Sequence, residues 1–345
     1  MAIKRYQKPS ALDLFCGSGA VSLGLKQAGF EVVGAVDLDV GACTTYRANH
    51  PEVKLVEKDI REVSAGDFDD VIPGKLDLLV VCAPCQPFSS QNRYKKDNDA
   101  RSNLVEQSKK FIIHFEPSIV FLENVPGLAS TDIFSNFSEW LGRAGYEVAK
   151  PMRIDASELG VAQRRIRMIL IAVKGVSLEK ASNIARIGKK TVGQLIRDLP
   201  TPPIGRNAAR EDPLHYSRRH SLLNIERLSH IPVNGGSRQS LPPHLQLTCH
   251  KNSRRSSFSD TYGRMSWDDI SPTLTTGCTD ITKGRYAHPV QNRAITLREA
   301  ARLQSFPDNY VFFGNASQVA MQIGNAVPPE MMRSIATSLK AAIQT

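Results

Sequence analysis

Hydrophobic and polar positions follow different patterns in the two halves of this 345-residue chain. Between residues 10 and 173, short apolar runs alternate with segments of helical spacing. The apolar runs are ALDLF (11–15), EVVGAVD (31–37), LDLLVVC (76–82), SIVFLENV (118–125) and RIRMILIAV (165–173). Such alternation is typical of strand–helix–strand units. We therefore predict an α/β fold with a doubly wound, mostly parallel, Rossmann-like sheet, whose ligands bind at the carboxyl ends of the strands.

After residue 173 the periodicity weakens, and stretches rich in Pro, Gly, Ser and Arg predict a smaller, irregular region. Its apolar residues are expected to form a small core of Leu222, Leu223, Ile225, Leu228, Leu245, Leu247, Phe258, Tyr262 and Trp267. Regular structure returns at Thr296, where Glu299 follows three residues later as in a capping box. A closing helix is predicted at about residues 328–344.

Positive charge is concentrated in the irregular region. The chain has 44 Lys and Arg against 34 Asp and Glu, a net charge of +10, and residues 176–292 account for +8 of it. Such an excess suits a polyanionic partner such as a nucleic acid. A solvated basic surface is the alternative, because many basic proteins bind no nucleic acid.

The six cysteines have no regular spacing, which favours a reducing cytoplasm over a disulfide framework. No apolar run approaches the roughly 18 residues of a membrane span, and the first ten residues lack the apolar core of a signal peptide. We expect a cytoplasmic protein with no membrane partner.

A glycine turn follows the first predicted strand. Gly17 and Gly19 come soon after Asp13, and Asp37 ends the second strand about 20 residues further on. Glycines let the backbone turn tightly against a ligand, and an acid after the second strand can accept hydrogen bonds from ribose hydroxyls. Because Ser22 replaces the third glycine of the dinucleotide motif, an adenosine cofactor without a pyrophosphate fits best. A tight turn without a ligand is the alternative.

The segment Pro84–Ser89, PCQPFS, follows a strand that is predicted to be buried. A cysteine at the carboxyl end of a strand can be a nucleophile, since backbone amides there favour the thiolate. Cys85 is therefore a candidate nucleophile. A buried structural cysteine and a redox pair with Cys82 remain alternatives. Zinc is disfavoured because no second pair of ligands accompanies this one.

Glu123 and Asn124 follow the apolar strand SIVFL. A carboxyl group at this strand end could meet Cys85 across a cleft and act as a proton donor. A loop acid or a helix cap is equally compatible with the local sequence.

The segment QRRIR leads into another apolar run. If it is a strand, Gln163, Arg165 and Arg167 share one face, because side chains alternate with a period of two. Two guanidinium groups would then point the same way. The alternative is an exposed edge strand whose charged side chains prevent pairing with another chain.

Taken in order, these segments closely resemble the signature blocks of the cytosine-5 DNA methyltransferase family, of the bacterial restriction–modification or orphan type. The blocks are DLFCGSG (13–19), PCQPFS (84–89), ENV (123–125), QRRIR (163–167), REAARLQSFP (298–307) and QIGNAVPP (322–329). The resemblance covers nearly the whole chain, with the basic region in the variable target-recognition position. Cys16 and the Cys82-Ala83 pair depart from common choices in the family, but neither replaces a reacting group.

The resemblance implies an activity and a role for each block. It implies transfer of a methyl group from S-adenosylmethionine to C5 of a flipped-out cytosine in a specific double-stranded DNA sequence, through a covalent bond between Cys85 and C6. The implied catalytic residues are Cys85, Gln86, Glu123, Asn124, Arg165 and Arg167. The implied cofactor contacts are Asp13, Phe15, Gly17, Ser18, Gly19, Asp37, Leu38, Asp59, Ile60, Pro84, Asn325 and Ala326. The candidate DNA contacts are Ser89, Gln163, Arg238, Arg254, Arg255 and Arg264.

The same resemblance implies an organisation and partners. Residues 1–175, completed by 310–345, would form the catalytic and cofactor-binding domain, and residues 176–309 the target-recognition domain. The product is S-adenosylhomocysteine, and no metal is required. We expect a monomer near the nucleoid and allow for a cognate restriction endonuclease that acts independently. A transfer-RNA cytosine-5 methyltransferase and a catalytically inactive DNA-binding homologue are the rival hypotheses.

Overall fold

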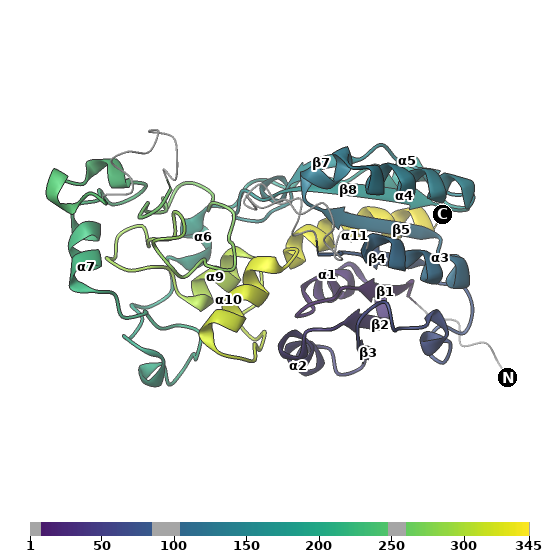
Figure 1. Cartoon of the computed structure of the whole chain (residues 1–345), viewed down its shortest axis with the longest axis horizontal. Coiled ribbons are helices and arrows are strands. Elements are labelled where there is room, and N and C mark those ends of the chain that lie inside the picture. The colour runs from purple at the N-terminus through teal and green to yellow at the C-terminus, as the bar shows by residue number, and fades with distance from the viewer. Residues whose placement is uncertain (1–7, 85–103, 248–259, 345) are drawn as a thin grey trace. The chain divides into compact units, whose positions relative to one another are not determined.

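The computed structural model describes residues 8–84, 104–247 and 260–344 (Figure 1). The chain divides into two compact units. The first unit comprises residues 1–159, 166–187 and 327–345, and the second comprises residues 160–165 and 188–326. These boundaries differ from the predicted domains: residues 176–187 join the first unit, whereas 160–165 and 310–326 join the second. The functions of the two units remain predictions.

Eight strands of the described chain form one sheet in the first unit, in the order β3-β2-β1-β4-β5-β8-β6, with β7 also paired to β8. The strands are β1 (Ser10–Leu14), β2 (Glu31–Asp37), β3 (Lys54–Glu57), β4 (Leu78–Val81), β5 (Ile119–Asn124), β6 (Glu147–Val148), β7 (Met152–Asp155) and β8 (Ile166–Val173). Strands β1 to β5 pair in parallel, which confirms the predicted α/β class.

Strand β8 differs from the prediction, because it is antiparallel to β5, β6 and β7. Only ten residues separate the end of β7 from the start of β8. A connection that short joins antiparallel neighbours, whereas a parallel crossover needs about a dozen residues or more. Including the run at 165–173 among the parallel strands was therefore wrong.

The strand register places the motif residues at one edge of the sheet. Leu14 pairs with Val36 on one side and with Val81 on the other, and Val81 pairs with Leu122. In strand order, the first residues beyond this row are Asp37, Phe15, Cys82 and Glu123, each within or leading into a predicted site segment. Four segments that are far apart in the sequence therefore end side by side.

Helices cover both faces of the sheet, as predicted for a doubly wound fold. They are α1 (Ala20–Ala28), α2 (Val40–Asn49), α3 (Lys109–Phe115), α4 (Asp132–Arg143), α5 (Leu178–Ser182) and α11 (Pro329–Ile343). On one face, Leu12 and Leu122 of the strands pack with Phe111 of α3 and Phe137 of α4. On the other face, α1 packs against α11, which also contacts α5. Alternation along β1 places Asp13 on this second face.

The second unit contains short helices joined by irregular segments, as the sequence predicts. In its described residues the α-helices are α6 (Val192–Ile196), α7 (Leu222–Ser229), α9 (Leu297–Leu303) and α10 (Ala316–Asn325). The capping box of Thr296 and Glu299 at the start of α9 is confirmed. So is the closing helix of the first unit, α11.

The predicted core of the second unit is correct only in part. Leu228, Leu245 and Tyr262 are buried in one cluster, and Leu247 packs against it. Three side chains of α7 are instead exposed: Leu222, Leu223 and Ile225. Of the side chains of this eight-residue helix, only Leu228 is buried in the core. Trp267 is half-buried against His288, and Phe258 lies outside the described residues.

The contact between α1 and α11 predicts the effect of one substitution. A Cβ added at Gly24 would lie 2.5 Å from the Pro329 carbonyl oxygen and 2.7 Å from the Met332 Cβ. Gly24→Ala should therefore lower the free energy of unfolding by about 1–3 kcal/mol, as overpacking of a core does. Gly142→Ala in α4 is the matched control, since its Cβ meets nothing within 4 Å. The control should stabilise by up to about 1 kcal/mol. Equal unfolding midpoints in urea would contradict this account.

Candidate active site

The turn after β1 has an unusual backbone. Phe15, Gly17 and Gly19 have φ angles of 63°, 52° and 93°, in the left-handed region that glycine adopts easily and phenylalanine rarely does. The Gly17 amide donates to the Asp37 Oδ2 over 2.8 Å, so the turn is fixed to the end of β2. A Cβ at Gly17 would meet nothing within 4 Å, which leaves open space beside the turn.

Asp37 retains capacity for a ligand. Its two oxygens accept from the Gly17 and Asp39 amides, and a carboxylate has about four acceptor positions. Burial raises the pKa of this carboxyl group, while the two backbone hydrogen bonds oppose the rise. The neighbouring Leu38 side chain is 61% exposed. An acceptor for hydroxyl groups beside an exposed apolar side chain fits an adenosine moiety.

Asp13 is fully buried behind this turn. Its Oδ2 accepts from the Ser22 hydroxyl over 2.7 Å, and that hydroxyl is also 2.7 Å from the Tyr46 hydroxyl. Among the described residues, no group bonds to the other oxygen, Oδ1. Burial raises the pKa of Asp13 to about 7. A buried acceptor without a partner suits a cationic or N–H-bearing ligand, so this residue also fits the predicted cofactor.

Asp59 and Ile60 follow β3. Both carboxylate oxygens of Asp59 bind Arg61, and this interaction lowers the pKa of Asp59 to about 2. Asp59 is therefore a carboxylate, as an acceptor for an adenine amino group must be. The Ile60 side chain is buried in the sheet core, which leaves its main chain for any cofactor contact. The Ile60 carbonyl already accepts from the Lys110 ammonium group.

Glu123 and Arg167 form an ion pair at the end of β5. The Arg167 Nε lies 2.9 Å from the Glu123 Oε1, and the side chains are 15% and 8% exposed. Glu123 is opposite Ile169 in the antiparallel pairing, so Arg167 is its diagonal neighbour on the same face. Because β8 begins at Ile166, Arg167 is on the strand as predicted.

The neighbouring Asn124 connects β5 to the segment after β4. Its Nδ2 donates to the Ala83 carbonyl over 3.0 Å, and its Oδ1 accepts from the Val125 amide over 2.8 Å. Ala83 is two residues before Cys85. Cys85, Gln86 and Ser89 lie outside the described residues, and Pro84, the last residue before them, is exposed.

Cys82 lies just after β4 rather than inside it, and is half-buried. Burial and the charge of Glu123 raise the pKa of its thiol well above the ordinary range. A thiol that resists ionisation is a poor partner for disulfide exchange. This observation weighs against the alternative of a redox pair formed by Cys82 and Cys85.

Gln163 and Arg165 belong to the second unit and precede β8, so the predicted face shared with Arg167 is wrong. The Gln163 amide bonds to Gln304 and to the Leu274 main chain, within the protein interior. Arg165 is also buried and donates to the carbonyls of Leu274, Gly324 and Asn325. Both side chains are thus engaged inside the second unit, and their predicted contacts with DNA and with the reacting base remain predictions.

Arg264 is a second correction. Only 1% of its surface is exposed, and its guanidinium donates to the main-chain carbonyls of Leu228, Ile231, His288 and Gln291 and to the Asn292 side chain. With every nitrogen so engaged, Arg264 holds the loops of the second unit together and has no donor left for DNA. Arg238 is half-buried in a short 3₁₀ helix, and Arg254 and Arg255 lie outside the described residues.

Comparison with known proteins identifies the family. The family model described as C-5 cytosine-specific DNA methylase matches residues 10–341. The chain is 35% identical over 344 residues to the Type II methylase M.HgiDII of Herpetosiphon aurantiacus, covering 97% of this chain and 96% of the relative. This chain belongs to that family. As a member it is a DNA (cytosine-5-)-methyltransferase.

Two further comparisons agree. The methylase is 33% identical over 354 residues to the Type II methyltransferase M.PspPI of a Psychrobacter strain, covering 98% of this chain and 80% of the relative. A solved Escherichia coli structure, described as a candidate DNA modification methyltransferase of a prophage, superimposes with a TM-score of 0.77 at 22% identity. It covers 98% of this chain and all of that one. This similarity shows the fold alone.

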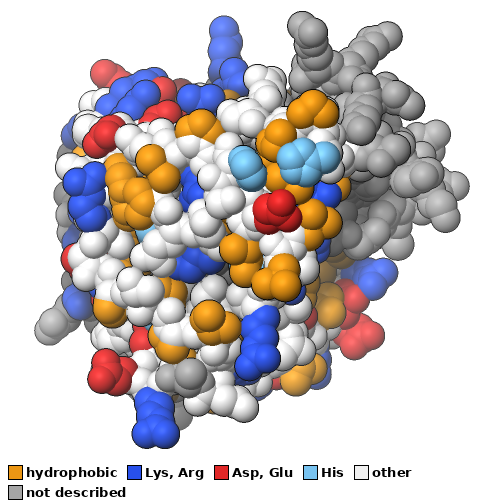
Figure 2. Space-filling view, turned by 90° about the vertical axis from the view of Figure 1, so that its left-hand side faces the viewer, with side chains coloured by type: hydrophobic (Ala, Val, Ile, Leu, Met, Phe, Trp, Pro, Cys, Tyr) orange, Lys and Arg blue, Asp and Glu red, His pale blue; other side chains and the backbone are white. Residues whose placement is uncertain are grey.

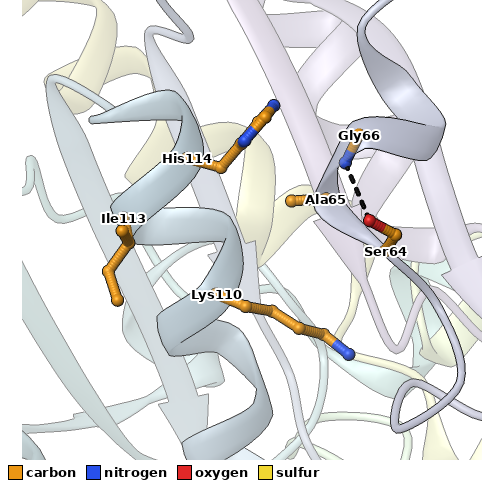
Figure 3. Close-up of a pocket in the computed structure, with 6 residues that line it drawn as sticks. All are labelled: Ser64, Ala65, Gly66, Lys110, Ile113 and His114. Carbon is orange, nitrogen blue, oxygen red and sulfur yellow. Dashed lines mark hydrogen bonds between the residues drawn. The ribbon is translucent and has the colours of Figure 1, made fainter.

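A separate pocket in the first unit contains none of the predicted site residues. It is a cavity of about 590 Å³ lined by Ser64, Ala65, Gly66, Lys110, Ile113 and His114 (Figure 3). The His114 Nε2 lies 2.6 Å from the Asp69 Oδ1, within hydrogen-bond distance. In the parts of the chain that the structure describes, no group of three or more His, Cys, Asp or Glu could hold a metal ion. No helix there is long and apolar enough to cross a membrane.

The sequence analysis missed the residues that support the site. Ser22 bonds to Asp13 and is itself bonded to Tyr46, Arg61 binds Asp59, and Gln304 bonds to Gln163. Gln304 had a signal, because it lies within the REAARLQSFP block, and Ser22 stands where the dinucleotide motif has its third glycine. Tyr46 and Arg61 carry no motif of their own.

Burial of Asp13 predicts a pH-dependent stability of the methylase. Its pKa is raised when folded, so the folded form retains a proton that the unfolded form loses between pH 4 and 7, and stability falls as pH rises. As pH rises through this window, the difference in free energy of unfolding between the wild type and Asp13→Asn should fall by at most about 1.4 kcal/mol per pH unit. Urea unfolding at several pH values measures this. Asp39→Asn, at an exposed position, is the control. Parallel profiles for wild type and Asp13→Asn would refute the assignment.

The role of Arg264 is tested by Arg264→Lys. Lysine cannot serve the same set of carbonyls, and each buried acceptor left without a partner costs about 1–3 kcal/mol. The free energy of unfolding should fall by about 3 kcal/mol or more. Arg210→Lys, at an exposed position, should change it little. If Arg264→Lys kept wild-type stability and lost only DNA affinity, Arg264 would be a DNA contact after all.

Proposed function

We propose that this methylase transfers the methyl group of S-adenosylmethionine to C5 of a cytosine that has been flipped out of a specific double-stranded DNA sequence. Flipping is needed because the target atom is inaccessible in a stacked duplex, and it costs a few kcal/mol. The observation that carries the proposal is the arrangement at the end of β5. There Glu123 pairs with Arg167, and Asn124 bonds to Ala83, two residues before the candidate nucleophile.

In this proposal Cys85 adds to C6 of the cytosine as a thiolate. Bonding at C6 makes C5 nucleophilic, provided that the ring nitrogen N3 is protonated or strongly hydrogen-bonded, which is the role of Glu123. Arg167 forms an ion pair with the Glu123 carboxyl group and so can orient it. In the proposal, Arg167 would also meet the cytosine carbonyl oxygen. Asn124 and Gln86 keep the Cys85 segment in position.

The cofactor supplies an electrophilic methyl group. Transfer of that methyl group from the cofactor sulfur to C5 would leave S-adenosylhomocysteine as the product. The C5 proton then leaves, the bond between Cys85 and C6 breaks, and the electron pair restores the ring double bond. Cytosine and S-adenosylmethionine thus give methylcytosine, S-adenosylhomocysteine and one proton. No metal takes part.

The chain's residues for the cofactor come from the strand ends described above. Asp37 would accept from the ribose hydroxyls, Asp59 from the adenine amino group, and Phe15 and Leu38 would contact the adenine ring. Gly17, Ser18 and Gly19 would let the backbone approach the cofactor, with Asp13 behind them. Ile60, Pro84, Asn325 and Ala326 would complete the contacts; Asn325 is exposed at the end of α10.

The second unit would recognise DNA. On the molecular face shown in Figure 2, Lys and Arg side chains are scattered among apolar and uncharged groups, with a few Asp and Glu side chains between them. Separate cations of this kind can each contact a backbone phosphate. Arg238, Arg254 and Arg255 remain the candidate contacts there, and Ser89 in the first unit. The Type II names of the relatives support a restriction–modification setting with an independent endonuclease. A monomeric methylase is a further part of the proposal.

Methyl transfer tests the proposal. With radiolabelled S-adenosylmethionine, the wild type should label duplex DNA and not transfer RNA, and a chelator should have no effect. Cys85→Ser should abolish labelling, and Glu123→Gln should slow it by about 10²–10⁴-fold, the range for loss of a general acid. A duplex with 5-fluorocytosine should trap the wild type covalently, since fluorine cannot leave as the proton does.

Each of these measurements has its own contradicting outcome. Labelling of transfer RNA alone would favour the RNA-modifying rival, and DNA binding without any transfer would favour the inactive homologue. Undiminished labelling by Cys85→Ser, or no trapped complex, would exclude the covalent route.

A further inference from the structure

Three buried side chains of the second unit form one hydrogen-bonded network. Gln163 and Gln304 have no exposed surface, and Arg165 is 3% exposed. The Gln163 Nε2 donates to the Gln304 Oε1 over 2.7 Å. The Arg165 Nη1 donates to the Leu274 carbonyl over 3.2 Å, and the Leu274 amide donates to the Gln163 Oε1 over 3.1 Å. Gln163 and Arg165 are thus joined through one main-chain residue.

The network ends on the carboxyl end of α10. Gln304 Nε2 donates to the carbonyls of Ile323 and Ala326, and Arg165 Nη2 to those of Gly324 and Asn325 over 3.1 and 3.4 Å. The last carbonyls of a helix have no partner within the helix, and a cation is favoured beside them. Four consecutive carbonyls here accept from only two side chains. We call Gln163, Arg165 and Gln304 the α10 cap.

The orientation of both glutamine amides is determined by a main-chain group. The Leu274 N–H can only donate, so the Gln163 oxygen must face it and the Gln163 NH₂ must face Gln304. The Gln304 oxygen therefore accepts, and its NH₂ group is directed at the helix end. A glutamate at position 304 would set a carboxylate against the same carbonyls.

Close packing restricts the same helix end further. A Cβ added at Gly324 would lie 2.4 Å from the Thr275 carbonyl carbon and 2.6 Å from the Thr276 nitrogen. The backbone of α10 therefore touches the backbone of residues 275–276 directly. Asn325, the last residue of α10, is exposed, although the helix end that carries it is closely packed.

We propose that the α10 cap makes Gln304 a positioning residue for the cofactor, by fixing the main chain of Ile323 to Ala326 so that Asn325 and Ala326 are presented in one conformation. Gln304 itself touches neither cofactor nor DNA in this proposal. The inference rests on the proposed function, which gives Asn325 and Ala326 their role. It also reassigns Gln163 from a DNA contact to a support of Gln304.

Calorimetric titration of the full chain with S-adenosylhomocysteine tests the proposal. Gln304→Glu keeps the size of the side chain and removes the donor, and Gln304→Met removes both donor and acceptor. Each should raise Kd at least about tenfold, which is about 1.4 kcal/mol. The KM for duplex DNA should stay within about threefold of the wild type, because the DNA contacts are elsewhere.

Gln246→Glu is the matched control. Gln246 is exposed, and its Nε2 donates to the Leu241 carbonyl over 3.0 Å in the same unit, outside the α10 cap. Its loss should leave Kd within about twofold of the wild type. Hydrogen exchange at the Leu274 amide provides a second readout, since that amide donates to the Gln163 side chain. Exchange there should accelerate in folded Gln304→Met, because the Gln163 amide loses its acceptor, and should change less in Gln304→Glu, which keeps that acceptor.

The outcomes separate the inference from the function on which it rests. If either folded position-304 variant binds S-adenosylhomocysteine as tightly as the wild type, the inference is overturned. The same holds if Kd and the KM for DNA rise together. A wild type that does not bind S-adenosylhomocysteine would instead overturn the proposed function. If Gln304→Glu does not fold, Gln304→Met decides.

Discussion

The hydrogen-bonded register of β1, β4 and β5 is the constraint on which the candidate active site depends. Leu14, Val81 and Leu122 form one row across these strands. The glycine turn, the segment leading to Cys85 and the Glu123 carboxyl group all start just beyond it. A slip of one residue in any strand would reverse which side chains face the core. The packing of both sheet faces therefore protects the alignment of the site.

Three acids at this edge are stabilised in three different ways. Glu123 has a cation, Arg167, within 2.9 Å. Asp37 accepts two backbone amides. Asp13 has hydroxyl groups on one side only, and its burial favours the neutral form. The same residue type can thus be an anchor for the turn, a hydrogen-bond acceptor for a ligand or a partner in an ion pair. The neighbours of the acid decide which.

In the second unit, the main requirement is a supply of hydrogen-bond donors for buried main-chain carbonyls. The unit has little regular structure, so many of its main-chain carbonyls lack partners in a helix or sheet, yet buried carbonyls require donors. Long side chains with several N–H groups meet this need. Arg264 serves four carbonyls between Leu228 and Gln291, and Arg165 serves three near α10. Positive charge in an irregular unit is therefore not by itself evidence of a nucleic-acid contact.

The sequence alone determined the α/β class, the closing helix, the capping box at Thr296 and the residues at the ends of β1, β2 and β5. These features depend on local periodicity and on short-range spacing, which a linear chain displays directly. Only the tertiary structure decided that β8 runs antiparallel, that Arg264 and Gln163 face inward, and that Leu222 is exposed. Those outcomes depend on which distant main-chain groups need a donor and on which side of a helix meets a core. Both are properties of the packed chain, because residues as far apart as Gln163 and Gln304 must first be brought together.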